Sequence, residues 1–331
     1  MVILSFFKYH KLHISMKLPT TLPIILDGGM GRELERIGAP FQQPEWSAHA
    51  LIESPHYVSQ VHRNFIHAGA EIITTNTYAL VPFHIGEKRF NEQGADLIKL
   101  AAKLARDCVN DNDVSGVDVS NSVNVNSKVL VAGCIPPVLG SYRPDLFSVS
   151  QAEPLLEALI VNQEADIDFW LAETISSIAE AAMIKVRTAQ TSKPTWIAFT
   201  VKDEINTESR LRSGETVFAA VSQIAGQHVS AILFNCSAVE VMESALINAK
   251  QALLALGLEG KVQLGVYANN FPPIGELREA NNDEGLSIIR NDISPLKYRE
   301  FVSAWINAGA SIVGGCCGVS AEHIKKVAEL K

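Results

Sequence analysis

Cysteine is the residue type whose placement in this 331-residue sequence most strongly suggests chemistry. Cys316 and Cys317 are adjacent in SIVGGCCGVS, after a β-branched run and two glycines, and Cys236 ends a second β-rich run, SAILFNC. Thiolates are ligands that suit zinc, and a catalytic zinc site keeps one position open for water or substrate. If the ends of these two strands converge, the three cysteines predict a sulfur site for Zn²⁺ with a fourth position left free.

Other interpretations of the cysteines stay open. A single buried cysteine is usually a small hydrophobic residue, and we expect this of Cys108 and Cys134. Cys316 and Cys317 could form a vicinal disulfide or act as a redox dithiol, although the strained ring and a reducing compartment argue against the disulfide. The two preceding glycines favour a metal, because neighbouring strand residues point to opposite faces unless the chain leaves the pleat.

The elements that must position these thiols alternate between β-rich runs and helical patterns, which is typical of βα units around a parallel sheet. Eight such units over about 300 residues predict an α/β fold of the (β/α)8 TIM-barrel type. We expect one barrel domain over residues 21–331 and a loose tail over residues 1–20. The eight β-rich runs cover residues 23–29, 71–77, 128–134, 168–174, 194–200, 230–236, 261–267 and 311–317, and clear helical patterns cover 54–68, 92–109, 238–256 and 294–308.

The connecting segments are unequal in length. Helix-to-strand joints are brief, whereas long segments follow four of the strands, at residues 78–91, 135–150, 201–215 and 268–292. In barrels the loops after the strands carry the active site at the C-terminal face, so these lengths predict function at that face. A polar stretch at residues 110–127 precedes a strand and is expected to be a solvated insertion on the opposite face.

Polar residues at other strand ends extend the predicted site. Asp27 ends the first strand before glycines whose backbone N–H groups could bind a carboxylate, beginning with Gly28. Glu173 ends the fourth strand and could hold an ammonium group, and Thr75 and Asn76 end the second. Two structural alternatives remain: Glu173 could stabilise the N-terminus of the following helix, and Asp27 could bond its own turn.

Composition and absent motifs exclude several function classes. The net charge is −8 and no basic block occurs, so nucleic acid and membrane surfaces are not expected partners, and small-molecule substrates are. None of the nine histidines ends a predicted strand, which disfavours a His-ligated hydrolytic zinc barrel and a Ser/His/Asp hydrolase. Free cysteines without a secretory signal indicate a cytoplasmic protein.

Five motifs in this order, LDGGMGREL, GAEIITTNTY, FWLAETI, FNC and GGCCG, resemble the homocysteine S-methyltransferase family over nearly the whole chain. The resemblance implies a zinc-bearing barrel in which Cys236, Cys316 and Cys317 hold the metal and homocysteine thiolate takes the open position. It also implies that Glu173 and the turn at Asp27 and Gly28 hold the ammonium and carboxylate groups of the amino acid. The segments AGCIPPVLGSYRP and VYANNF depart from the family pattern where the methyl donor should bind.

The resulting hypothesis is a zinc-dependent methyltransferase that converts L-homocysteine to methionine in methionine biosynthesis. S-methylmethionine or S-adenosylmethionine is favoured as the onium donor over betaine, and Tyr78, Tyr142 and Tyr267 are candidate aromatic groups facing the cation. Beyond the metal-activated substrate thiolate, no protein group is assigned as catalytic. The alternative is a non-catalytic barrel that binds zinc or a thiol.

Overall fold

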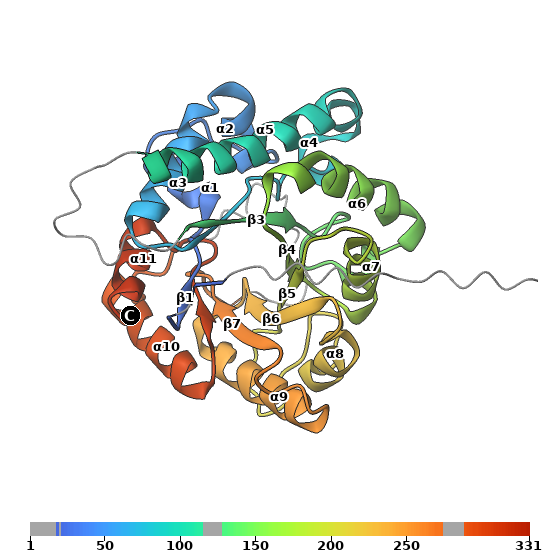
Figure 1. The fold of residues 1–331 in the computed structure, drawn as a ribbon, viewed down its shortest axis with the longest axis vertical. Coiled ribbons are helices and arrows are strands. Elements are labelled where there is room, and N and C mark those ends of the chain that lie inside the picture. The colour runs from blue at the N-terminus through green and yellow to red at the C-terminus, as the bar shows by residue number, and fades with distance from the viewer. Residues whose placement is uncertain (1–17, 20, 115–127, 274–287) are drawn as a thin grey trace, which may run out of the picture.

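Eight parallel strands form the centre of the protein. The computed structural model describes residues 18–19, 21–114, 128–273 and 288–331. The strands follow one another around a single sheet in the order β1-β8-β7-β6-β5-β4-β3-β2, which Figure 1 shows end on. Their bounds are β1 Ile24–Ile25, β2 Ile72–Thr74, β3 Leu130–Ile135, β4 Phe169–Ile175, β5 Thr195–Phe199, β6 Val229–Asn235, β7 Gln263–Tyr267 and β8 Ile312–Val313.

The first and last strands are the shortest, and they complete the ring. Strand β1 pairs with β8 through Ile24↔Ile312 and Ile25↔Val313. On its other side, a parallel bridge joins Leu26 to Ile72 of β2, and the Asp27 N–H donates to the Ile72 carbonyl at 3.0 Å. The sheet is therefore a closed (β/α)8 barrel, and the predicted fold class is confirmed.

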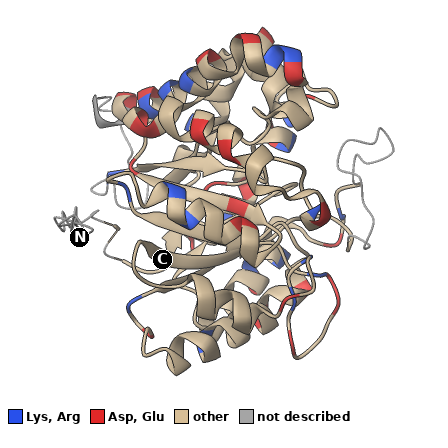
Figure 2. Ribbon diagram, turned by 90° about the vertical axis from the view of Figure 1, so that its right-hand side faces the viewer, with Lys and Arg blue, Asp and Glu red and all other residues tan. Residues whose placement is uncertain are grey.

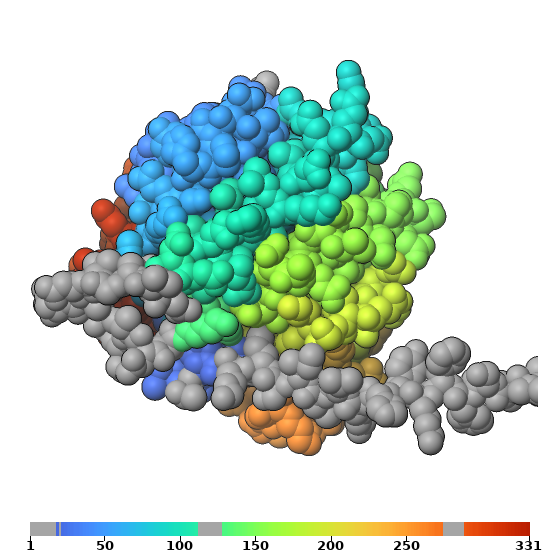
Figure 3. All heavy atoms as spheres, turned by 45° about the horizontal axis from the view of Figure 1, so that its top comes forward, coloured from blue at the N-terminus to red at the C-terminus, as the bar shows by residue number. Residues whose placement is uncertain are grey.

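Helices surround the barrel in chain order (Figure 1), and many charged residues lie on them, as the side view in Figure 2 shows. On one face, α5 and α6 pack side by side over the strands (Figure 3). Among the described residues no helix is both long and apolar enough to cross a membrane. The helices are α1 Met30–Arg36, α2 Ser47–Glu53, α3 His56–His67, α4 Pro82–Ile85, α5 Glu87–Val114, α6 Val149–Gln163, α7 Ile178–Thr188, α8 Val217–Ile224, α9 Met242–Ala255, α10 Pro295–Ala308 and α11 Ala321–Ala328, with 3-10 turns η1 Pro144–Leu146, η2 Glu164–Asp166 and η3 Val239–Val241.

The interior of the barrel is packed with side chains and is not a channel. Alternate strand residues point inward, so that on β4 Phe169 and Leu171 belong to the inner cluster while Trp170 belongs to the layer between strands and helices. The rings of Phe169 and Trp196 lie 4.3 Å apart at their centroids. A filled interior leaves the rim at the C-terminal ends of the strands as the place for a site.

Each predicted β-rich run overlaps an observed strand, and each of the four predicted helical patterns overlaps a helix. The main difference is α5, which continues to Val114 and so includes the first five residues of the polar stretch predicted as an insertion. There the Asp111 carboxylate pairs with Arg63 of α3 at 3.0 Å, which helps to hold this end of the helix. The rest of that stretch, the predicted tail apart from residues 18 and 19, and the middle of the loop after β7 lie outside the described residues.

Candidate metal and substrate site

The sulfur atoms of Cys236, Cys316 and Cys317 form a cluster above the barrel. The three atoms all lie within 4.8 Å of one another. Cys316 Sγ is 3.0 Å from Cys236 Sγ and 4.0 Å from Cys317 Sγ, and the third distance is 3.8 Å. Three thiolates around one tetrahedral Zn²⁺ stand about 3.8 Å apart, given Zn–S bonds of about 2.3 Å. The donor set and its spacing therefore fit a zinc-type ion.

The backbone at the ends of β6 and β8 brings these sulfurs together. Cys236 directly follows β6 and has a φ of 52°, in the left-handed region that non-glycine residues rarely occupy. Gly314 and Gly315, which follow β8, pack closely against their neighbours. An added Cβ would lie 2.5 Å from Leu26 Cβ at Gly314 and 2.1 Å from Val319 Cγ1 at Gly315. The glycines are needed because no side chain fits, and the chain leaves the pleat there as the sequence predicts.

The electrostatics of the cluster favour one thiolate among the three groups. Thiol donation from Cys316 and Cys317 lowers the pKa of Cys236 well below its usual range, although burial opposes this. The same contacts raise the pKa of Cys316, and the contact with Cys236 raises that of Cys317. All three cysteines are free, so the vicinal disulfide considered for Cys316 and Cys317 is not formed in this structure.

Glu173 lies near the end of β4, facing the same space. Its Oε1 accepts a hydrogen bond from the Cys134 thiol at 3.0 Å, and its Oε2 accepts one from the Tyr267 hydroxyl at 3.3 Å. Burial raises the pKa of Glu173 to about 7. Helix α7 is capped instead by Ser177, whose hydroxyl accepts from the Glu180 N–H at 3.2 Å, so the capping interpretation of Glu173 is wrong.

Asp27 follows β1 and bonds across to β2. Its Oδ2 accepts from the Thr74 N–H at 2.7 Å and its Oδ1 from the Thr74 hydroxyl at 3.1 Å, so its main partners lie on the next strand. Burial, reinforced by the charge of Glu173, raises the pKa of Asp27 to about 8. An added Cβ on Gly28 would lie 2.4 Å from the Val319 carbonyl oxygen. The Gly29 N–H already donates to that carbonyl at 3.0 Å and is therefore not open to an anion, whereas a role of Gly28 in binding the substrate stays a prediction.

Thr75 and Asn76 lie at the pocket wall, but their polar atoms bond to other parts of the protein. Thr75 Oγ1 donates to Gln163 Oε1 at 2.9 Å and accepts from the Cys134 N–H at 2.9 Å. Asn76 Nδ2 donates to the Ser47 carbonyl at 3.1 Å. These bonds fix the end of β2 against its neighbours.

A cavity of about 170 Å³ opens beside the sulfur cluster and collects the predicted residues. It is lined by all three cysteines, both carboxylates, Gly28, Thr75, Asn76 and the candidate tyrosines Tyr78, Tyr142 and Tyr267. It is also lined by residues that sequence reasoning missed, namely Met30, Arg32, Trp46, His84 and Phe271. These residues lie in loops or at helix starts, where no strand-end pattern marks them. His84 belongs to the wall of this cavity although no histidine ends a strand.

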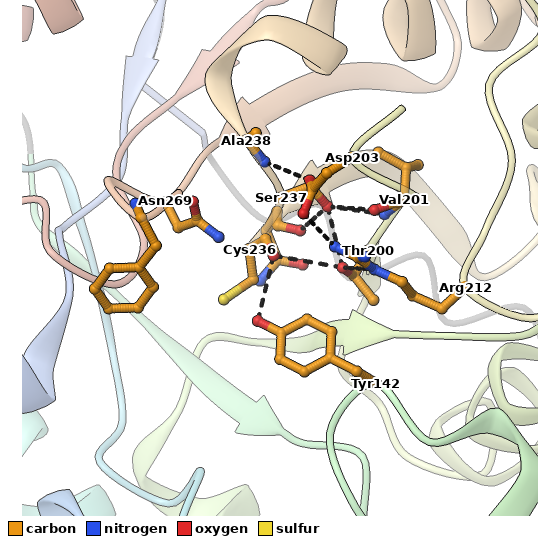
Figure 4. Close-up of polar contacts among 11 residues, drawn as sticks. Tyr142, Thr200, Val201, Asp203, Arg212, Cys236, Ser237, Ala238 and Asn269 are labelled. Atoms are coloured by element: carbon orange, nitrogen blue, oxygen red, sulfur yellow. Dashed lines mark hydrogen bonds and ion pairs between the residues drawn. The ribbon is translucent and has the colours of Figure 1, made fainter. Parts of the chain in front are cut away.

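Asn269, in the loop after β7, is a further residue beside the cluster. Its backbone N–H donates to the Ser237 carbonyl at 3.1 Å, and its side chain is only 2% exposed. Its Nδ2 atom has no hydrogen-bond partner within the described ranges, and Figure 4 shows the amide turned toward Cys236. A buried polar donor without a partner next to three sulfurs is consistent with a site built to hold a bound group.

The sequence that forms the barrel and its cysteine cluster matches one protein family. The family model described as homocysteine S-methyltransferase matches residues 24–330, which is most of the chain. A barrel with this match is a methyltransferase. The chain belongs to the homocysteine S-methyltransferase family, and the resemblance seen in the motifs is confirmed.

Individual relatives agree along nearly their full lengths. The chain is 27% identical to homocysteine S-methyltransferase 1 of Zea mays, covering 92% of this chain and 93% of the relative. It is 28% identical to the homocysteine S-methyltransferase of Escherichia coli, covering 89% and 90%. The metallated form of the E. coli homocysteine methyltransferase MmuM superposes with a TM-score of 0.70 and 27% identity, covering 94% of this chain and 97% of that one.

Proposed function

We propose that this protein transfers a methyl group from an onium donor to L-homocysteine in a zinc-dependent reaction that yields methionine. The observation that carries the proposal is the cluster of three cysteine sulfurs at the wall of a cavity that also contains two buried carboxyl groups. A relative with the same fold has been solved in a form described as metallated.

Cys236, Cys316 and Cys317 would hold the zinc. Their sulfurs face one another at the cavity wall, and a free thiol titrates near 8.5, so it is mostly protonated at neutral pH. Zinc at this position would keep the sulfur of homocysteine as a thiolate, the nucleophilic form. The protein supplies three sulfur ligands and leaves the fourth position to the substrate.

Glu173 and Asp27 would hold the amino-acid part of the substrate. Neither carboxylate forms an ion pair with a cation in the described parts of the chain, and burial raises the pKa of both. An ammonium group placed between them would restore their ionised forms and gain two charge-assisted hydrogen bonds. The substrate would then be held at two points, its sulfur by the metal and its ammonium group by the two carboxylates.

The tyrosines of the cavity wall, Tyr78, Tyr142 and Tyr267, would face the methyl donor. The Tyr78 hydroxyl bonds to Ser141 Oγ at 2.7 Å and the Tyr267 hydroxyl to Glu173, so both rings are fixed in place. Cations are attracted to aromatic faces, which suits a sulfonium donor such as S-methylmethionine or S-adenosylmethionine. The homocysteine sulfur would form the new S–C bond with its electron pair, and the pair of the broken bond would stay on the donor sulfur, a displacement that depends on alignment.

Metal analysis combined with a donor assay tests this proposal. We expect about one zinc per chain, lost in Cys236→Ser, together with methionine formation from homocysteine and S-methylmethionine or S-adenosylmethionine. Cys108→Ser is the matched control, because that cysteine is also fully buried but its thiol bonds to the Ser59 carbonyl. Activity with betaine but with neither sulfonium compound would show that the proposed donor is wrong. Zinc-loaded protein that binds homocysteine but is inactive with all three donors would instead be the non-catalytic barrel.

A further inference from the structure

A buried ion pair lies close to Cys236 of the sulfur cluster. Arg212 and Asp203, from the segment between β5 and α8, are joined at 3.0 Å between Arg212 Nη2 and Asp203 Oδ2. Their side chains are only 8% and 3% exposed. Removing two charges from water is costly, so a buried ion pair is by itself no evidence of a gain in stability, and its other contacts matter.

The pair ties the segment after β6 to the segment after β5. Asp203 Oδ1 accepts a hydrogen bond from the Ala238 N–H at 2.7 Å, and Arg212 Nε donates to Thr200 Oγ1 at 3.4 Å. Ser237 Oγ accepts from the Val201 N–H at 2.9 Å. Figure 4 shows these groups arranged around the backbone on both sides of Cys236.

The same cluster holds the carbonyl group of Cys236. The Tyr142 hydroxyl donates to the Cys236 oxygen at 3.3 Å and Thr200 Oγ1 donates to it at 3.5 Å. The Arg212 guanidinium lies over the Tyr142 ring, 5.2 Å from its centroid. One cation therefore contacts both side chains that bond to this carbonyl.

This carbonyl belongs to a strained backbone. Cys236 has a φ of 52° and Tyr142 a φ of 63°, in the left-handed region that is unfavourable for non-glycine residues. Such conformations persist only where the surroundings hold them. At Cys236 the backbone conformation also sets the direction of the Cα–Cβ bond, and the Cys236 sulfur lies 3.0 Å from that of Cys316.

We propose that Tyr142, Thr200, Arg212 and Asp203 are positioning residues of the metal site, which hold Cys236 in its left-handed conformation so that its sulfur meets those of Cys316 and Cys317. The inference rests on the proposed zinc-dependent function. The Tyr142 hydroxyl then holds the Cys236 carbonyl, a role separate from any contact of the Tyr142 ring with the methyl donor.

Zinc affinity, measured by competition with a chelator, tests the inference in Tyr142→Phe and Arg212→Lys. Tyr142→Phe removes only the hydroxyl, and Arg212→Lys keeps the charge but loses the planar fork that reaches Asp203 and Thr200. We expect zinc to bind about tenfold more weakly in each, the effect typical of residues that orient metal ligands. Cobalt bound in place of zinc should show shifted absorption bands, because they report ligand geometry.

Arg106→Lys is the matched control. Arg106 pairs with Asp168 at 2.8 Å, and Asp168 Oδ2 also accepts from the Val131 N–H at 2.7 Å, so this is the same type of clamp at the other end of the barrel. Its zinc affinity and cobalt spectrum should match those of the wild type. Wild-type protein that takes up no zinc would overturn the proposed function. Zinc-binding wild type with both site variants equal to Arg106→Lys in affinity and spectrum would overturn this inference alone.

Discussion

Carboxyl groups beside the strands have different partners at the two ends of the barrel. At the amino ends of the strands, Glu71 pairs with Lys331 at 2.6 Å and also accepts from the Ile25 N–H, while Asp168 pairs with Arg106. At the carboxyl ends, the partners of Asp27 are groups of Thr74, and those of Glu173 are a thiol and a phenol.

The contrast separates carboxylates that are paired with cations inside the protein from the two that the proposed function assigns to the substrate. Asp168 and Glu173 stand at opposite ends of the same strand, β4, so the difference lies in their partners and not in the element. At the amino end a cation and a backbone N–H satisfy the carboxylate within the protein. At the carboxyl end burial raises the pKa of Asp27 and Glu173, as expected where a positive group from outside completes the site.

The largest expected effect that tests this comparison is on substrate binding in Glu173→Gln. The amide keeps the shape of the side chain but cannot be ionised, so the ammonium group loses a charged partner. We expect KM for homocysteine to rise about 30-fold, corresponding to about 2 kcal/mol, with zinc content unchanged. An unchanged KM would mean that Glu173 does not hold the substrate.

The pH dependence of ligand binding should give a smaller effect. With pKa values raised to about 7 for Glu173 and about 8 for Asp27, both carboxyls are mostly protonated below pH 6 and ionise as the pH rises. We expect the affinity for L-methionine, a product without a titrating thiol, to increase about tenfold from pH 6 to pH 8. Calorimetry on the zinc-loaded protein measures this, and the slope should become shallower in Glu173→Gln. A flat profile in the wild type would contradict ionisation at these carboxyls.

The smallest effect is expected at the amino end, from Asp168→Asn. Losing the charge weakens the contacts with Arg106 and the Val131 N–H, so the free energy of unfolding in urea should fall by about 1 kcal/mol. Zinc affinity and KM for homocysteine should stay at wild-type values. A raised KM in this variant would remove the distinction between the two ends.

Most of the fold was predictable because each β-rich run is bounded by helical patterns and turn residues. The approach of Cys236 to Cys316 and Cys317 followed from the same pattern, since parallel strands bring their carboxyl ends to one rim. Cys134 was grouped with structural cysteines. It is fully buried, but its thiol also bonds to Glu173, a contact between adjacent strands that depends on register and rotamer.

The rest of the site depends on loops whose course the sequence does not reveal. Trp46 and His84 reach the cavity from segments outside the strands, and His84 Nδ1 lies 3.3 Å from the Pro44 carbonyl, a contact between helix α4 and the loop before α2. The Asp203–Arg212 pair was also missed, because its members lie nine positions apart in an irregular segment. Periodicity describes the scaffold, whereas these contacts depend on tertiary packing.

The close contact between the glycine turns after β1 and β8 has a consequence for how the protein matures. An added Cβ on Gly29 would lie 2.6 Å from the Cys316 carbonyl oxygen, and the Gly315 N–H donates to the Asp27 carbonyl at 3.0 Å. Residues from the two ends of the chain thus form the site together, and only when the ring closes. During synthesis the emerging polypeptide has Cys236 long before Cys316 and Cys317, and domains fold as units once their elements are present. Binding of the proposed metal ion is therefore expected only after the C-terminal strand has been synthesised and the ring has closed.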